Sequence, residues 1–506
     1  MELNFERQEL MTDRKIFEGT AEQSIDTEIT LPDYYPEVSK ILTCQSKINI
    51  QNKQCSGGTA TIGGQVLLTV LYLDPDGELN IYACDQPFTK TLETNTDCEN
   101  ATLTASASVN YINHKANAPR RFELHGSFTV SVSVFTSASA TLIKAVENSN
   151  IFVRSTEFVC IEPIERLRKL SYIEDEINTD TKPAVAKLIR QECYAIISEC
   201  KFLNQKAMVK GDLIIELVYL SADCRKYTLS RVHGFSQIID CEHSNENTDC
   251  SARAEVISFE TMVKGTSDGE NKAVGFEAKL EIELRCSRKR EMTAVSDAFS
   301  DRYAVEVVTE KYDIVKSREA FVESFVCKKS YELPECGDEI LDIWPSAVTE
   351  RSAVDDGKLF VKGTVNIAAL YKTSSGETAF YCKPVDFEYS KDDCEECEYY
   401  SALVRLKAIS STLASNGTVE TEVEMEISVI KTVMDTVTVL RDIECDESEP
   451  ITRDENTAVT LYFAENECVW EIAKHYKSSP KDICRINDIE SIDTKCNKVL
   501  LVPNCL

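Results

Sequence analysis

Residues 64–88 read GQVLLTVLYLDPDGELNIYACDQPF, and the pattern returns at residues 211–235 (GDLIIELVYLSADCRKYTLSRVHGF) and 363–387 (GTVNIAALYKTSSGETAFYCKPVDF). The three stretches align without gaps over 25 residues and begin 147 and 152 residues apart. After the first glycine, apolar residues occupy every second position, which is the period of a strand with one buried face. Turn residues and a second run follow, so each copy predicts a β-hairpin. The tyrosines that follow each glycine by eight residues are predicted to lie in the core: Tyr72, Tyr219 and Tyr371.

Two further features flank each copy. Upstream, a stretch that contains proline (residues 31–41, 183–188 and 333–343) predicts a short helix or a turn before the sheet. Downstream, residues 127–134, 278–285 and 422–429 alternate between apolar and polar, as in an antiparallel sheet with one face in water. The sequence therefore predicts a mainly β protein with three β-rich repeats, each a sandwich or a partly closed barrel. Repeats of this length are whole domains rather than solenoid units.

A different pattern begins after the third repeat. Residues 459–503 read VTLYFAENECVWEIAKHYKSSPKDICRINDIESIDTKCNKVLLVP. A short strand at 459–463 precedes a predicted helix, Ser479 and Pro480 mark the start of a second helix, and residues 498–502 predict a closing strand. The residues that share the apolar face of the first helix are Val469, Ile472, Ala473 and Tyr476. We expect a small C-terminal βααβ domain at 456–506, after repeats at 1–155, 156–310 and 311–447.

The overall charge limits the classes of partner. The chain has 55 basic and 85 acidic residues and a formal net charge of −30. Such a field repels nucleic acid and anionic membrane surfaces, and it favours a basic or an apolar contact with a protein. Charged residues occur from residue 2 onward, the apolar runs are no longer than a strand, and no lipidation pattern is present. We therefore expect no signal peptide, no membrane insertion and a cytoplasmic protein.

The cysteines and histidines do not form a recognisable chemical motif. The 21 cysteines are odd in number and irregularly spaced, which predicts reduced thiols rather than a disulfide framework. Cys394 and Cys397 have metal-ligand spacing, but a second pair or a nearby histidine is missing, and acidic neighbours oppose a reactive thiol. The five histidines, and the glycine patterns, match no catalytic or nucleotide-binding motif. The sequence predicts no metal, no cofactor and no enzymatic activity.

The C-terminal segment resembles a LysM domain. The resemblance rests on Tyr462, residues 469–473 (VWEIA), Tyr476, Ile483, Asn487 and residues 500–503 (LLVP). LysM domains usually recognise glycans that contain N-acetylglucosamine, and some bind proteins. One departure is Cys468, which stands where a threonine commonly caps the first helix, at a cost of roughly 1 kcal/mol. This replacement weakens the expectation of glycan contact and leaves that of a groove for a protein.

Three β-rich repeats before one LysM domain, in an acidic and cysteine-rich chain, resemble the SPOCS-domain spore coat morphogenetic proteins of the endospore-forming clostridia. The resemblance implies a non-enzymatic scaffold or adaptor in the mother-cell cytoplasm that gathers at the forespore surface. It also implies that the LysM domain docks a protein, the coat-basement ATPase SpoIVA. The alternative is a LysM protein that binds peptidoglycan or the spore cortex.

The predicted partner-binding site is the LysM groove, which lies between the loops at each end of the helical pair. Its residues are Glu467, Cys468, Val469, Trp470, Asn487, Asp488 and Ile489. Trp470 is consistent with a core residue between the helices or with an interface anchor, since aromatic residues dominate binding hot spots. Ile489 likewise fits a contact residue or a part of the small core.

Overall fold

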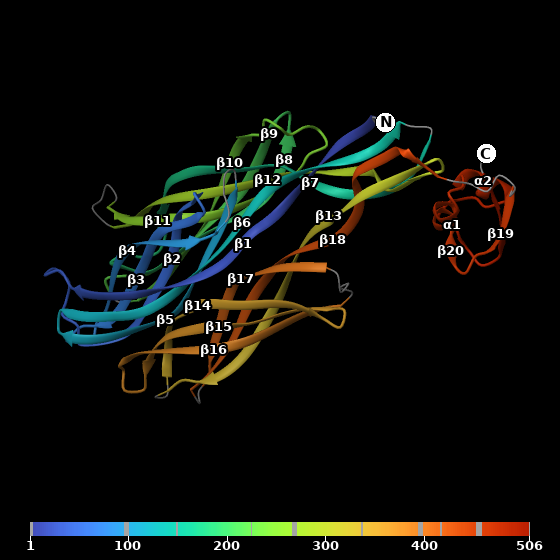
Figure 1. Ribbon diagram of the computed structural model, residues 1–506. Helices are drawn as coiled ribbons and strands as arrows, with labels where there is room; N and C mark the ends of the chain where they lie inside the picture. The colour runs from blue at the N-terminus through green and yellow to red at the C-terminus, as the bar shows by residue number, and fades with distance from the viewer. Residues whose placement is uncertain are drawn as a thin grey trace.

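The computed structural model describes residues 4–95, 101–147, 150–223, 225–265, 271–334, 337–392, 398–414, 417–451 and 458–504. Within these ranges the chain forms long antiparallel strands, with two short helices near the C-terminus (Figure 1). Repeat 1 consists of β1 (Asn4–Thr30), β2 (Lys40–Ser56), β3 (Thr59–Leu73), β4 (Leu79–Glu93), β5 (Thr102–Ala118) and β6 (Arg121–Glu147). Repeat 2 consists of β7 (Ile151–Asn178), β8 (Lys187–Leu203), β9 (Lys206–Leu220), β10 (Lys226–Asp240), β11 (Asp249–Lys264) and β12 (Ala273–Ser300). Repeat 3 consists of β13 (Tyr303–Glu332), β14 (Gly337–Asp355), β15 (Lys358–Thr373), β16 (Thr378–Lys391), β17 (Glu398–Leu413) and β18 (Thr418–Pro450).

Each repeat has the same topology of two three-stranded antiparallel sheets. In repeat 1, β6 lies between β1 and β5, and β3 lies between β2 and β4; repeats 2 and 3 follow this order. Apolar side chains from both sheets meet in one core per repeat, which is the packing of a β-sandwich. The prediction of a mainly β protein with repeated sheet units is confirmed.

The recurring tyrosines join each hairpin to the stretch before it. All three side chains are buried, as predicted from their position in the repeat. Each hydroxyl donates a hydrogen bond to a main-chain carbonyl in the proline stretch. The bonds join Tyr72 to Pro36 (3.2 Å), Tyr219 to Pro183 (2.8 Å) and Tyr371 to Pro334 (2.7 Å). In repeats 1 and 2 this stretch is a turn and not a helix, and its carbonyls are therefore available as acceptors.

The recurring glycines allow a close approach between strands. Gly64 in β3 and Gly211 in β9 each lie where the register of the neighbouring strand shifts by one residue. A Cβ atom would lie 2.1 Å from the Asn49 carbonyl oxygen at Gly64, and 2.3 Å from the Ile196 carbonyl oxygen at Gly211. No larger residue fits beside these bulges without moving the backbone.

The outer halves of the longest strands bind the three repeats together. The pairs β1/β6, β7/β12 and β13/β18 continue beyond the sandwiches as two-stranded ribbons, which run side by side toward the end of the molecule that holds the C-terminus (Figure 1). Their inner faces share buried cores to which all three repeats contribute. The side chains include Leu10, Leu142, Phe158, Met292, Ile314 and Val439. The repeats are therefore joined by packing and not only by the chain.

The tail, defined as residues 458–504, has two helices, with two short strands before them and two after them in the sequence. In it β19 (Val459–Phe463) pairs with β22 (Val499–Pro503), and β20 (Glu467–Cys468) pairs with β21 (Lys495–Cys496). The helices α1 (Val469–Tyr476) and α2 (Pro480–Ile486) lie between these pairs in the sequence. In the described part of the chain, neither helix is long and apolar enough to cross a membrane.

Candidate functional site

Local sequence signals account for the start of both helices of the tail. Helix α1 begins after Cys468, whose main-chain amide donates to the carboxylate of Glu471 (3.0 Å). This half of a capping box compensates for the cysteine at the cap position, and it holds the pKa of Glu471 below its usual range. Helix α2 begins after Ser479, whose hydroxyl accepts from the Asp482 amide (3.3 Å), as the sequence predicts.

The predicted groove residues do not form one exposed face. Cys468, Val469 and Trp470 are buried, whereas Asp488 is exposed. Ile489 is half-buried and packs against the core of the tail. The two loops of the predicted groove are joined directly, because the Trp470 amide donates to the carbonyl of Ile492 (2.9 Å).

The two remaining groove residues, Glu467 and Asn487, are engaged inside the tail. Glu467 accepts a hydrogen bond from the Tyr462 hydroxyl (2.6 Å), and this bond raises the pKa of Tyr462 to about 12. Asn487 brackets the backbone of Leu501: its amide nitrogen donates to the carbonyl, and its amide oxygen accepts from the N–H, both at 2.8 Å. Both side chains thus hold the tail together.

Trp470 is covered by repeat 2. Its side chain is 1% exposed, and its ring meets the ring of Phe299 edge to face at 5.0 Å. The indole Nε1 donates to one carboxylate oxygen of Asp297 (2.8 Å), and Lys474 donates to the other (2.6 Å). Trp470 is therefore both a core residue and an anchor, but the surface that it anchors belongs to the same chain.

The outer face of the β19–β22 sheet exposes five large apolar side chains. Leu461 is 71% exposed and Phe463 is 54% exposed, opposite Leu501 and Val499 in the register. The alternate residues Leu500 and Val502 point into the core. Figure 1 shows β19 on the side of the tail that faces away from the repeats. The members of this apolar face are Val459, Leu461, Phe463, Val499 and Leu501.

Sequence reasoning missed both surfaces of the tail for different reasons. Asp297 and Phe299 lie in β12, and Arg154 of β7, which pairs with Asp493 of the tail (2.6 Å), is still farther away in the sequence. No local pattern connects such distant residues. The apolar face could have been predicted from the sequence. Leu461 and Phe463 alternate with inward-facing residues, in a strand too short to be buried on both sides. The CxxC pair, Cys394 and Cys397, lies outside the described residues.

A family model described as SipL, SPOCS domain, matches residues 37–117 and 184–264. The matches start in the turns before β2 and β8 and end in β5 and β11, so they cover the same four strands of repeats 1 and 2. The matched stretches of repeats 1 and 2 are similar to the SPOCS domain of SipL. The equivalent strands β14–β17 of the third repeat lie outside the matches. Comparison with curated proteins gave no match, and comparison with solved structures gave none.

Proposed function

We propose that this SPOCS-domain protein is a non-enzymatic scaffold of the spore coat that docks a coat morphogenetic protein through its tail. The matched family supports a relation to the sporulation coat, and it is not a known enzyme family. The proposed partner is the coat-basement ATPase SpoIVA, and the proposed place of action is the forespore surface in the mother-cell cytoplasm. We assign the tail to the LysM class, in agreement with its element order and its buried positions Val469, Ile472 and Ala473.

The observation that carries the docking proposal is the apolar face of β19 and β22. Exposed apolar patches on one side of a small module favour contact with another apolar surface. A glycan also needs polar groups that fix its hydroxyls, and the five side chains of this face supply none. The contacts with repeat 2 are made through α1 and Asp493, and they leave the apolar face open. The ligand that suits this face is an apolar surface on a protein.

We place the partner surface on the apolar face rather than in the predicted groove. Three groove residues are buried, and Glu467 and Asn487 hold the tail together. Asp488 stays exposed and is available at the rim. This placement lets the tail remain docked on repeat 2 while it holds a partner.

The repeats would add further contacts. We propose one domain for each repeat and a LysM domain at 456–506, each able to present its own surface. The predicted ranges 1–155, 156–310 and 311–447 shift by a few residues, because β7 begins at Ile151, β13 begins at Tyr303 and β18 ends at Pro450. Several modest sites on one chain raise the effective concentration on the two-dimensional surface of a spore, without any single tight contact.

Binding of purified SpoIVA to the full chain tests the proposal. Leu461→Glu and Phe463→Glu should each weaken binding roughly tenfold or more, as expected when a hot-spot side chain is lost. The matched control is Val232→Glu, which alters a strand residue in β10 that is also exposed (64%). Equal binding by all three variants would contradict the docking face. Sedimentation with peptidoglycan that is lost in the Leu461 and Phe463 variants would favour the wall-binding alternative.

A further inference from the structure

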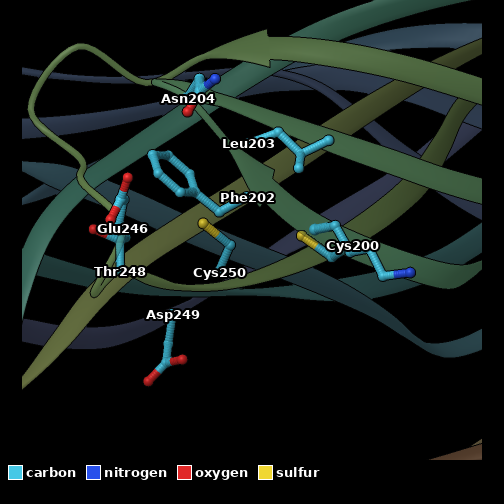
Figure 2. A pocket seen from close by; sticks show the side chains of 9 residues that line it. Cys200, Phe202, Leu203, Asn204, Glu246, Thr248, Asp249 and Cys250 are labelled. Carbon is cyan, nitrogen blue, oxygen red and sulfur yellow. The ribbon is translucent and has the colours of Figure 1, made fainter.

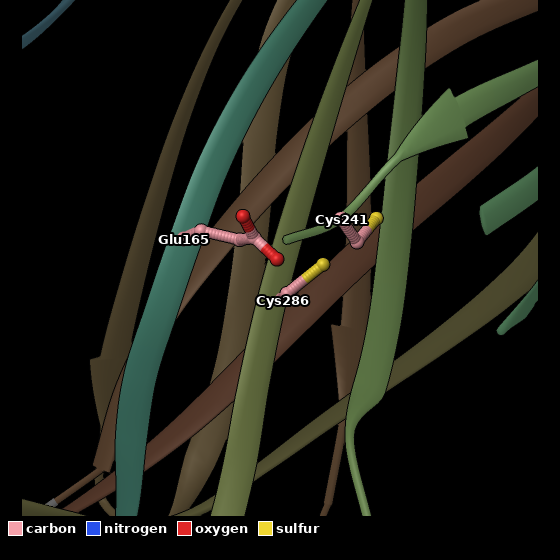
Figure 3. A group of neighbouring side chains, drawn as sticks. All are labelled: Glu165, Cys241 and Cys286. Carbon is pink, nitrogen blue, oxygen red and sulfur yellow. The ribbon is translucent and has the colours of Figure 1, made fainter. Parts of the chain in front are cut away.

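Four cysteines of repeat 2 converge although they are far apart in the sequence. Cys286 in β12 lies opposite Cys250 in β11, with the two Sγ atoms 3.4 Å apart. Cys241, just after β10, is fully buried. Its sulfur, the sulfur of Cys286 and a carboxylate oxygen of Glu165 in β7 lie within 4.8 Å of one another (Figure 3). Cys200 of β8 belongs to the same core.

Glu165 is a nearly buried carboxylate with little positive charge beside it. Its side chain is 9% exposed and accepts from the Ser244 hydroxyl (2.6 Å). Among the described residues, the cationic group at ion-pair distance is the exposed ring of His243, 3.6 Å away. Glu162, three residues earlier, is 2% exposed and pairs with two arginines at 2.8 and 2.9 Å. Because a buried carboxylate without a cation is costly, this contrast indicates that Glu165 is placed to receive a positive ion.

The fold does not require this cluster. The strand register aligns the facing pairs Phe17–Val134 in repeat 1, Glu165–Cys286 in repeat 2 and Ser317–Val433 in repeat 3. In repeat 1 the place is filled by an aromatic and an aliphatic side chain, which is ordinary sandwich packing. The carboxylate and the thiols are therefore a special feature of repeat 2.

The thiols of Cys250 and Cys286 share a hydrogen bond, with their Sγ atoms 3.4 Å apart. A thiolate is the form that binds metal, so each thiol that becomes a ligand would release its proton to solvent when a cation arrives.

A pocket lies beside the cluster. The pocket has a volume of about 420 Å³, and Cys200, Phe202, Glu246 and Cys250 are among its lining residues (Figure 2). Cys250 thus faces the pocket and is also in contact with Cys286. Among the four proposed ligands, Cys250 is the one that lines the pocket.

We propose that Glu165, Cys241 and Cys286 bind a thiophilic divalent cation, Zn²⁺ in the first place, with Cys250 as the fourth ligand. Two or three thiolates with one carboxylate form a donor set that suits zinc. A tetrahedral zinc site needs neighbouring donor atoms roughly 3.5–3.8 Å apart. The donor atoms of Glu165, Cys241 and Cys286 lie within 4.8 Å of one another, and the Sγ atom of Cys250 lies 3.4 Å from that of Cys286. The thiol protons leave to solvent on binding. The ion would fasten β7, β11 and β12 to the end of β10, and so stiffen the repeat against which the tail packs.

Zinc titration of the full chain, purified reduced and freed of metal, tests this site against a competing chromophoric chelator. The wild type should take up one tight equivalent, and Co²⁺ in place of Zn²⁺ should show the spectrum of tetrahedral thiolate coordination. Cys241→Ser and Cys286→Ser should lose that equivalent, and Glu165→Gln should bind at least about tenfold more weakly. The matched control is Cys193→Ser, which alters a buried thiol in β8 outside the cluster and should bind as the wild type does.

Two outcomes would overturn the proposal. One is the absence of a tight equivalent in the wild type. The other is equal uptake by the wild type and the Cys241 and Cys286 variants, which would assign the metal to other cysteines. If a serine variant fails to fold, alkylation of the wild type still decides, because Zn²⁺ should protect Cys250, which lines the pocket, and leave the exposed Cys382 unchanged. Equal labelling of Cys250 with and without Zn²⁺ would count against the site.

Discussion

Repeat 2 differs from repeats 1 and 3 at the outer end of its ribbon, although the three share one scaffold. The central strands β6, β12 and β18 each shift register beside an equivalent buried residue: Ile143, Val295 and Leu440. Four residues farther on they carry Glu147, Phe299 and Glu444. Phe299 packs on Trp470, whereas a carboxylate at this place would have to be buried without a partner. The residues that the three repeats share form the sandwich cores. A residue that is specific to repeat 2, Phe299, forms the contact with the tail.

The largest loss of stability is expected at the tyrosine that the three repeats share. Tyr219→Ala removes a fully buried ring and should lower the free energy of unfolding of repeat 2 by roughly 3–5 kcal/mol. Tyr72→Ala and Tyr371→Ala should cost about the same in their own repeats, as followed by denaturant unfolding. Tyr219→Phe keeps the ring and loses the bond to Pro183, so it should cost about 1 kcal/mol. A mild effect at one of the three alanine variants would show that the repeats are not equivalent.

The next largest effect is expected at Phe299, which distinguishes repeat 2 from the other two repeats. Phe299→Glu gives β12 the residue found in its two counterparts, and should weaken the docking of the tail by roughly 3 kcal/mol. Hydrogen exchange in residues 459–503 and the fluorescence of Trp470 should both report release of the tail. Glu444→Ala in repeat 3 serves as the control. Unchanged exchange in the Phe299 variant would mean that the tail is held by other contacts.

A smaller effect is expected at Asp297. Asp297→Asn keeps an acceptor for the Trp470 indole but removes the ion pair with Lys474. Because both groups of the pair are partly exposed, the loss should be about 1 kcal/mol or less. Hydrogen exchange in residues 469–476 should quicken slightly. A loss as large as that of Phe299→Glu would identify charge, and not ring packing, as the basis of docking.

The smallest effect is a pH dependence at helix α1. The bond from the Cys468 amide holds the pKa of Glu471 below its unfolded value, so its contribution is complete above that value and is lost as pH falls through the folded pKa. Glu471 is exposed, so the contribution should stay within about 1 kcal/mol. Thermal unfolding of the tail should lose part of its sensitivity to acid in Glu471→Gln. The same acid sensitivity in variant and wild type would exclude this cap.

Much of the fold follows from local patterns in the sequence. Alternation at residues 127–134 predicts a strand, and the turn chemistry around Gly77 predicts a hairpin. The face formed by Val469, Ile472 and Ala473 predicts a helix and its buried side. These features depend on residues within one strand or one helical turn.

The remainder depends on contacts over long distances in the chain. The strand predicted at 127–134 continues to Glu147, because its outer half packs on the ribbons of the other repeats. The burial of Trp470 requires Phe299, and the thiol cluster requires a register shift in β7 that brings Glu165 opposite Cys286. Local sequence patterns do not predict contacts between residues that are far apart in the chain. For this reason the irregular cysteine spacing indicated reduced thiols and no site.

The most direct test of the central claim is hydrogen exchange of the full chain in complex with purified SpoIVA. Docking through the apolar face predicts protection in residues 459–463 and 499–503, with the exchange of residues 469–476, already covered by repeat 2, unchanged. A complex that forms while these two strands exchange as in the free chain would contradict the account. Protection confined to residues 464–469 and 487–492 would instead place the partner in the predicted LysM groove.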